Sequence, residues 1–286
     1  MIISNLKSII QIFYGELFNF KIPFKTRVYR IIARGKISKL FENYYISKRK
    51  NIKIDTFKNN FIKINENVAS KELNSEGITL GINLDKKILF EILKFIKDKK
   101  FQFNRDKYKK IKFSERYDYK DLYILNYMNP HLENKFIKES LLNEKLISVI
   151  KNYLGVKPIL EWSQIYWSLP FKDKKGNILS PPNNEFGYHY DIDGFKFLKV
   201  FFYLTDVTKN NGPHVFIKKS GEKTLYKALN RRISDEQIES KFKNQKMVIT
   251  GLKGSGFIED TSFYHKGTNP VEERGILTCL YNISKW

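Results

Sequence analysis

The sequence predicts an α+β chain in which an antiparallel barrel or jelly roll follows a largely helical first half. Three observations lead to this prediction. Apolar residues at helical spacing dominate the chain up to Gly155, short β-branched and aromatic runs dominate after it, and turn-forming Asn, Gly and Pro residues separate those runs. With 286 residues, 42% of them hydrophobic, the chain can bury a large core, which excludes disorder of the whole.

Three apolar stripes predict helices in the first half. The first stripe covers residues 2–13, and a Lys/Arg-rich segment follows it. A short predicted strand at residues 76–80 precedes the second stripe, which covers residues 88–96. The third predicted helix spans residues 136–154, and Gly155 ends it in the manner of a helix C-cap glycine.

Seven short runs predict strands in the second half. Turn residues such as Asn210-Asn211-Gly212-Pro213 and Thr268-Asn269-Pro270 separate them. Many short strands behind a helical half favour a barrel or jelly roll with helices packed outside. The runs cover residues 159–168, 188–191, 197–205, 214–217, 246–250, 256–259 and 274–283.

The chain is strongly basic, with 52 Lys and Arg residues against 30 Asp and Glu, a net charge of +22. This balance indicates anionic partners. Only nine of the cations are arginine, the residue that reads nucleic acid best, so we expect no nucleic-acid partner. An AT-rich genome, which favours Lys, Asn and Ile codons, explains the excess equally well.

Residues 1–50 carry a net charge of +9. Two interpretations remain open for this basic segment. It is either an amphipathic arm that makes peripheral contact with an anionic membrane or docks a partner, or a helix packed on the main domain with its basic face in solvent.

Cys279 is the single cysteine of the chain, which excludes an intramolecular disulfide and indicates a reducing compartment. One cysteine and four histidines also exclude a Cys/His zinc finger. No run reaches the roughly 18 uncharged apolar residues of a membrane span, and the first twenty residues lack the features of a signal peptide. We therefore expect a cytoplasmic protein, at most peripheral at a membrane surface.

The triplet His189-Tyr190-Asp191 carries the clearest chemical signal. Side chains alternate faces along a strand, so His189 and Asp191 would project to one side and Tyr190 to the other. His265, on a distant strand or its end, supplies a third candidate ligand. Two imidazoles and one carboxylate form the facial triad of non-haem Fe(II) oxygenases. His214, in contrast, is interpreted as an ordinary strand side chain.

The segments around this triplet resemble the phytanoyl-CoA dioxygenase family. The resemblance covers roughly residues 75–286, in the order and spacing of that family, and leaves the first 70 or so residues outside. The segments that carry it are Glu76-Gly77-Ile78, Tyr153-Leu154-Gly155, His189-x-Asp191, residues 197–206, Asn210-Asn211-Gly212-Pro213, Val215-Phe216-Ile217, Ser220-Gly221, Gly254, Asp260, His265 and Arg274.

The resemblance implies a double-stranded β-helix, a cupin-like jelly roll, that binds Fe(II) and 2-oxoglutarate. The family splits 2-oxoglutarate with dioxygen into succinate and carbon dioxide while it oxidises a substrate. His189, Asp191 and His265 would hold the iron. Relatives that halogenate have lost the carboxylate, so its presence at Asp191 favours hydroxylation. The implied division is a basic, mostly helical extension over residues 1–70 and an oxygenase domain over residues 71–286.

Arg274 opens the last predicted strand, where its guanidinium could pair in bidentate fashion with the far carboxylate of 2-oxoglutarate. The alternative is a surface arginine in local ion pairs with Glu272 and Glu273. Further candidates for cosubstrate contacts come from neighbouring strands, and for each of them ordinary packing is an equal alternative. These candidates are Gln164, Tyr166, Tyr203 or Phe201, and Thr268.

Two predicted loops, residues 171–186 and 221–243, border the site and carry several lysines and arginines. They suit a phosphorylated, carboxylated or nucleotide-linked small molecule, an acyl-CoA or other lipid, or a charged glycan precursor, unless they form only a solvated face. A non-catalytic β-helix protein, attached to anionic membrane or nucleic acid through its basic arm, is the main alternative function. An acid/base enzyme without metal is disfavoured, because no nucleophile motif accompanies His189 and Asp191.

Overall fold

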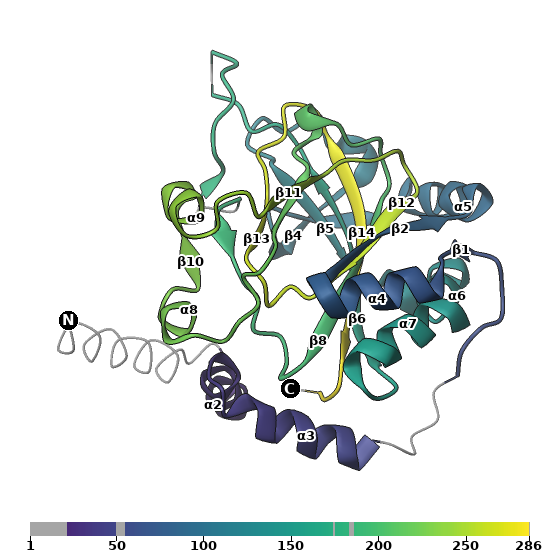
Figure 1. Cartoon of the computed structure of the whole chain (residues 1–286). Helices are drawn as coiled ribbons and strands as arrows, with labels where there is room; N and C mark the ends of the chain where they lie inside the picture. Colours follow the sequence, from purple (N-terminus) through teal and green to yellow (C-terminus); the bar gives the residue numbers. More distant parts are fainter. Residues whose placement is uncertain (1–21, 50–54, 174, 183–185, 286) are drawn as a thin grey trace.

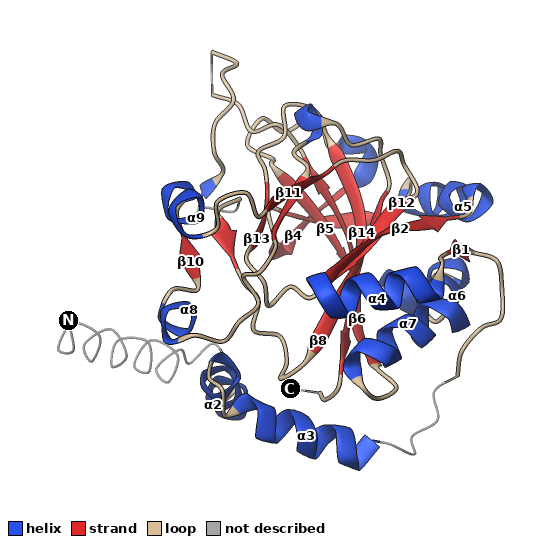
Figure 2. Cartoon of the chain, viewed as in Figure 1, coloured by secondary structure: helices blue, strands red, loops and turns tan. Residues whose placement is uncertain are grey.

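The computed structural model describes residues 22–49, 55–173, 175–182 and 186–285 (Figure 1). The predicted helix at residues 2–13 lies outside these ranges. The described part of the chain contains two antiparallel sheets, with helices gathered around them (Figure 2).

The larger sheet has nine strands in the order β1-β2-β12-β8-β14-β6-β5-β3-β4. Every neighbouring pair in it is antiparallel. Its strands are β1 (Ile62–Lys63), β2 (Ile78–Leu84), β3 (Lys100–Phe103), β4 (Asp106–Lys112), β5 (Ile124–Met128), β6 (Ile159–Ser168), β8 (Phe197–Tyr203), β12 (Ser255–Glu259) and β14 (Arg274–Asn282).

The smaller sheet has five strands in the order β10-β7-β13-β9-β11. The apolar side chains enclosed between the two sheets form a core of their own, which includes Phe201, Phe216, Phe257 and Ile276. The strands of the smaller sheet are β7 (Tyr188–His189), β9 (His214–Ile217), β10 (Arg232–Ile233), β11 (Lys246–Ile249) and β13 (His265–Gly267).

Strand β14 lies near the middle of the larger sheet, and all nine of its residues are buried. Its sequence is apolar on both faces because one face meets the inter-sheet core and the other meets the helical layer. Leu277, Cys279 and Tyr281 belong to the face that meets the helical layer, whereas Ile276 belongs to the face that meets the inter-sheet core.

Helices α4, α5, α6 and α7 form the helical layer beside the larger sheet (Figure 1). Two helices replace the single helix predicted at residues 136–154: the first has Leu142 as its C-cap, and Asn143 is the N-cap of the second. Its side chain accepts hydrogen bonds from the amides of Lys145 and Leu146, so a new helix begins after it. Gly155 is the predicted C-cap, with φ of 79°. The helices are α4 (Glu66–Glu76), α5 (Lys86–Ile96), α6 (Lys135–Leu141) and α7 (Glu144–Leu154).

Helices α2 (Phe24–Arg34) and α3 (Ser38–Arg49) precede this layer and lie at the end of the barrel (Figure 1). Phe195, which follows the His189 triplet, stacks on Phe41 and Tyr45 of α3, with ring centroids 5.0 and 5.7 Å apart. The basic N-terminal segment therefore packs, over its described residues, on the loop that leaves the candidate site.

The sequence predicted the strands of the second half closely, and the double-stranded β-helix is confirmed as the fold. The predicted strand at residues 188–191 is shorter and ends at His189. Strands β3, β4 and β5 were missed, and β1 pairs with β2, so the larger sheet starts before residue 71. The predicted loop at residues 221–243 contains β10 and two short helices, α8 (Leu225–Leu229) and α9 (Asp235–Lys241).

None of the described helices combines the length and the apolar character that a membrane crossing requires.

The position of β14 gives a prediction about stability. Leu277→Ala should lower the free energy of unfolding by about 2 to 5 kcal/mol, because the side chain is fully buried and its removal leaves a cavity. Urea denaturation followed by circular dichroism measures the change. Leu252→Ala, at a position that is 74% exposed, is the control and should change little. Equal effects of the two substitutions would contradict the central position of β14.

Candidate metal centre

His189 and His265 lie opposite each other on neighbouring strands of the smaller sheet. His189 ends β7, His265 begins β13, and the two are register partners with ring centroids 4.5 Å apart. Asp191 follows two residues after His189, and its backbone amide donates a hydrogen bond of 2.8 Å to the Thr261 carbonyl oxygen. Each of the three side chains offers a ligand atom, and these atoms all lie within 4.8 Å of one another.

The ring orientation of both histidines suits metal binding. Nδ1 of His189 lies 2.9 Å from the Gly187 carbonyl oxygen, and Nδ1 of His265 lies 2.9 Å from the Phe263 carbonyl oxygen. A carbonyl oxygen can only accept, so Nδ1 carries the proton in each ring and Nε2 keeps its lone pair. The two Nε2 atoms lie 3.9 and 3.5 Å from the Asp191 carboxylate oxygens.

The protonation states also favour ligation. Burial lowers the pKa of His189 and lowers that of His265 to about 4, so both rings are neutral at neutral pH. Burial by itself raises the pKa of Asp191, but the Lys199 ammonium and the two imidazoles outweigh it and hold that pKa well below its usual range. All three groups are therefore in the form that binds a cation.

Lys199 fixes the carboxylate of Asp191. Its Nζ atom, on β8 of the larger sheet, lies 2.7 Å from Asp191 Oδ2 and 2.7 Å from Asp193 Oδ2. This contact leaves the other Asp191 oxygen, Oδ1, toward His189. Lys199 was not among the residues predicted from the sequence, although a single charge inside the apolar run of residues 197–203 was a usable signal.

The three candidate ligands line a cavity of about 320 Å³. Of the predicted cosubstrate contacts, Arg274, Gln164, Tyr166 and Phe201 line it as well. Gln164 is held by Asn126, to whose Oδ1 its Nε2 donates a hydrogen bond of 2.5 Å.

Tyr203 and Thr268 are not among the described residues that line this cavity, and their contact with a cosubstrate stays a prediction. The Tyr203 hydroxyl donates to the Ile249 carbonyl oxygen at 2.7 Å, and the Thr268 hydroxyl donates to the Pro213 carbonyl oxygen at 3.0 Å. Both side chains use their hydroxyl groups to fix backbone.

Arg274 is the first residue of β14, as predicted, and is only 1% exposed. It is therefore not a surface arginine. Glu273, the residue before it, forms an ion pair with Arg116 instead, and its Oε2 atom lies 3.1 Å from Arg116 Nε. The Arg274 guanidinium donates through Nη1 to the Gly212 carbonyl oxygen, while its Nε has no hydrogen-bond partner, and no carboxylate in the described part of the chain forms an ion pair with it.

A buried guanidinium without a carboxylate is energetically costly. The Oγ1 atom of Thr278, on the same strand and the same cavity wall, is likewise buried without a hydrogen-bond partner among the described residues. Both groups are satisfied together if the cavity takes a small ligand that carries an anionic group.

His214 and Glu259 form a buried pair behind His265. His214 Nε2 lies 2.7 Å from Glu259 Oε2, and Glu259 Oε1 lies 3.6 Å from His265 Nδ1. Burial raises the pKa of Glu259 to about 8 and lowers that of His214 to about 3, so at neutral pH the Glu259 carboxyl is mostly protonated and the His214 ring is neutral. His214 was expected to be an ordinary strand side chain; it does lie on β9, but it lines the cavity.

The comparisons with known proteins concern the fold. No protein-family model and no curated protein sequence matches the chain. Among solved structures, EctD from S. alaskensis with bound Fe is 14% identical with a TM-score of 0.54, over 82% of each chain. SnoN, a non-heme alpha-ketoglutarate-dependent epimerase from nogalamycin biosynthesis, is 12% identical with a TM-score of 0.52, over 76% of this chain and 81% of its own.

HygX from Streptomyces hygroscopicus, with nickel and 2-oxoglutarate bound, is 9% identical with a TM-score of 0.51 over 77% of this chain and 87% of its own. At identities this low, the likeness establishes a shared fold.

The geometry predicts a divalent-metal site. His189→Ala and His265→Ala should each weaken Co(II) binding at least about tenfold, since each removes one ligand of three. Equilibrium titration of the chelator-treated protein measures the affinity. His131→Ala is the matched control, because the His131 ring lies away from the cavity, 2.6 Å from Ser163 Oγ. Equal affinities in all four proteins would rule out this site.

The Glu259 carboxyl predicts a pH dependence of stability in the metal-free protein. Its pKa rises from 4.5 in the unfolded chain to about 8 in the folded one. The folded state therefore gains stability that is complete below pH 4.5 and is lost as the pH rises through about 8, by up to about 1.4 kcal/mol per pH unit.

Glu259→Gln should remove this loss, because an amide does not titrate. Urea denaturation at several pH values measures it, with the exposed Glu239→Gln as control. A parallel decline of all three proteins would show that Glu259 ionises normally.

Proposed function

We propose that the chain is an Fe(II)- and 2-oxoglutarate-dependent oxygenase of the phytanoyl-CoA dioxygenase type, and that it hydroxylates a small-molecule, lipid or glycan-precursor substrate. His189, Asp191 and His265 would hold the iron. Arg274 would bind the far carboxylate of 2-oxoglutarate. Gln164 and Thr278 would face the same cosubstrate from adjacent strands.

The observation that carries the proposal is the buried, unpaired guanidinium of Arg274 in the cavity that the candidate metal ligands line. A ligand that chelates a metal at one end and carries a carboxylate at the other fits both features, and 2-oxoglutarate has this form. A non-catalytic binding protein would not require three metal ligands and the Arg274 guanidinium in one cavity.

The residues of the chain prepare the site in separate ways. Bound iron would supply the activation of dioxygen and of the keto acid. Lys199 holds the Asp191 carboxylate in one orientation through its 2.7 Å contact. The backbone carbonyls of Gly187 and Phe263 fix the tautomers of the two histidines, so metal binding requires no loss of a proton from either ring.

The solved structures with this fold support the proposal. EctD from S. alaskensis is known with 2-oxoglutarate and 5-hydroxyectoine, and HygX with nickel and 2-oxoglutarate. SnoN is an epimerase, so the fold does not by itself specify hydroxylation. The carboxylate of Asp191 favours hydroxylation. A cytoplasmic location completes the proposal.

Anaerobic titration of the metal-free protein with Fe(II) and 2-oxoglutarate tests the function. A weak visible charge-transfer band should form, because the keto acid chelates the iron. The band should be absent in His265→Ala and Asp191→Ala, and Arg274→Met should weaken the apparent affinity for 2-oxoglutarate at least about tenfold. His131→Ala should behave as the unchanged protein. Folded protein that gives no band with iron in excess would refute the proposal.

A further inference from the structure

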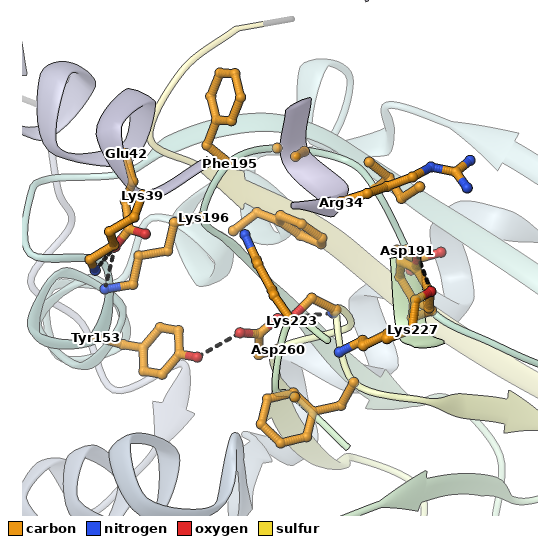
Figure 3. A pocket seen from close by; sticks show the side chains of 18 residues that line it. Arg34, Lys39, Glu42, Tyr153, Asp191, Phe195, Lys196, Lys223, Lys227 and Asp260 are labelled. Carbon is orange, nitrogen blue, oxygen red and sulfur yellow. Dashed lines mark hydrogen bonds and ion pairs between the residues drawn. The ribbon is translucent and has the colours of Figure 1, made fainter. Parts of the chain in front are cut away.

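A second cavity, of about 260 Å³, lies beside the metal centre (Figure 3). Asp191 lines both cavities, so the two share a wall at the metal ligand. Helices α2 and α3 contribute one side, and the loops before His265 and after His189 contribute the other. We call it the lysine cavity, because its lining includes Lys39, Lys196, Lys223 and Lys227 together with Arg34.

Lys227 is the most enclosed of these cations, with 6% of its surface exposed. Its Nζ atom donates a hydrogen bond of 2.6 Å to the Ser220 carbonyl oxygen and lies 5.2 Å from the ring centroid of Tyr190. An ammonium group has three protons to donate. Within the described part of the chain, the bond to Ser220 uses one of them, and no carboxylate lies within ion-pair distance.

Lys223 likewise uses one of its three donor positions within the described part of the chain. Its Nζ atom donates a hydrogen bond of 2.6 Å to Ser38 Oγ on α3, and no ion pair involves it among the described residues. Burial lowers the pKa of Lys223 and lowers that of Lys227 to about 7. Both lysine side chains face one cavity, and in their protonated forms they have four donor positions unused.

The acidic side chains of the cavity are already engaged. Asp260 accepts from the Tyr153 hydroxyl at 2.6 Å and from the Ser262 amide at 2.9 Å. Glu42 lies 2.8 Å from Lys39 and 3.5 Å from Lys196, as the dashed lines in Figure 3 mark. Asp260 attracts both Lys223 and Lys227, but its single negative charge is smaller than the two positive charges that these lysines carry when protonated.

We infer that the lysine cavity binds a phosphate group, and that the substrate of the adjoining site is a phosphate monoester. This inference rests on the proposed function. A phosphate monoester carries up to two negative charges and three terminal oxygens, which match two ammonium groups with four free donors better than a carboxylate does. The volume accommodates one phosphate with a few attached atoms, and Asp191, which lines both cavities, places the lysine cavity next to the candidate metal ligands.

Phosphate binding to the full-length, metal-free protein tests the inference, since removal of the metal prevents phosphate from binding there. Calorimetric titration with inorganic phosphate and with glycerol 3-phosphate measures the affinity at fixed ionic strength. Lys227→Met replaces the buried ammonium by an apolar side chain of similar length, and Lys223→Gln tests the less enclosed lysine. Lys110→Met, on the exposed face of β4, is the matched control.

The affinity for both ligands should fall at least about tenfold in Lys227→Met and in Lys223→Gln, and should be unchanged in Lys110→Met. Equal affinities in all proteins, or an equal loss in the control, would overturn the inference. Phosphatidylcholine vesicles with and without phosphatidic acid distinguish the source of the phosphate. Vesicle binding that the two variants abolish assigns the site to a lipid phosphate, and soluble binding alone assigns it to a free phosphate ester.

The Fe(II) and 2-oxoglutarate band, recorded on the same variants, separates this inference from the proposed function. A band that persists while phosphate binding is lost supports both. A band in every protein with phosphate binding unaffected by either variant refutes the lysine cavity alone. Phosphate binding that depends on Lys227, without a band in any protein, refutes the oxygenase and leaves an anion site.

Discussion

The contact between Lys199 and Asp191 connects the two sheets at the point where the chemistry is located. Lys199 belongs to β8 of the larger sheet, and Asp191 follows β7 of the smaller one. The Lys199 ammonium and the Asp191 carboxylate are both largely buried and compensate each other's charge, so a shift of one sheet against the other would leave two unpaired charges in the interior. The orientation of the Asp191 carboxylate, and with it the candidate metal centre, follows from this pairing.

Two further groups of polar side chains depend on the same enclosed space. His214 and Glu259 lie 2.7 Å apart behind His265 and are both mostly neutral at neutral pH, while Arg274 lies across the cavity without a carboxylate among the described residues. Neutral groups need no counter-charge, whereas the buried guanidinium of Arg274 does. This difference in charge identifies Arg274 as the group that would bind an anion.

In the lysine cavity, on the other side of Asp191, some charged side chains likewise have partners within the protein and others have donor positions to spare. Glu42 and Asp260 have partners within the protein, whereas Lys223 and Lys227 each use one donor. Helix α3 provides Ser38 and the Glu42 pairs, so the basic N-terminal segment helps to form the cavity over its described residues. Of the two interpretations of that segment, docking arm or packed helix, the structure supports the packed helix for α2 and α3.

The sequence by itself predicted most strands of the second half and supplied His189, Asp191 and His265 as candidate ligands. Period-two alternation, turn residues and the spacing of His189 and Asp191 are local patterns, whereas the resemblance to the phytanoyl-CoA dioxygenase family directed attention to Arg274. The tertiary structure alone decided that His265 faces His189, that Lys199 holds Asp191, and that Tyr203 and Thr268 lie outside the cavity. These features depend on register and burial between residues far apart in the chain, where the charge of a side chain is set by neighbours that no local pattern specifies.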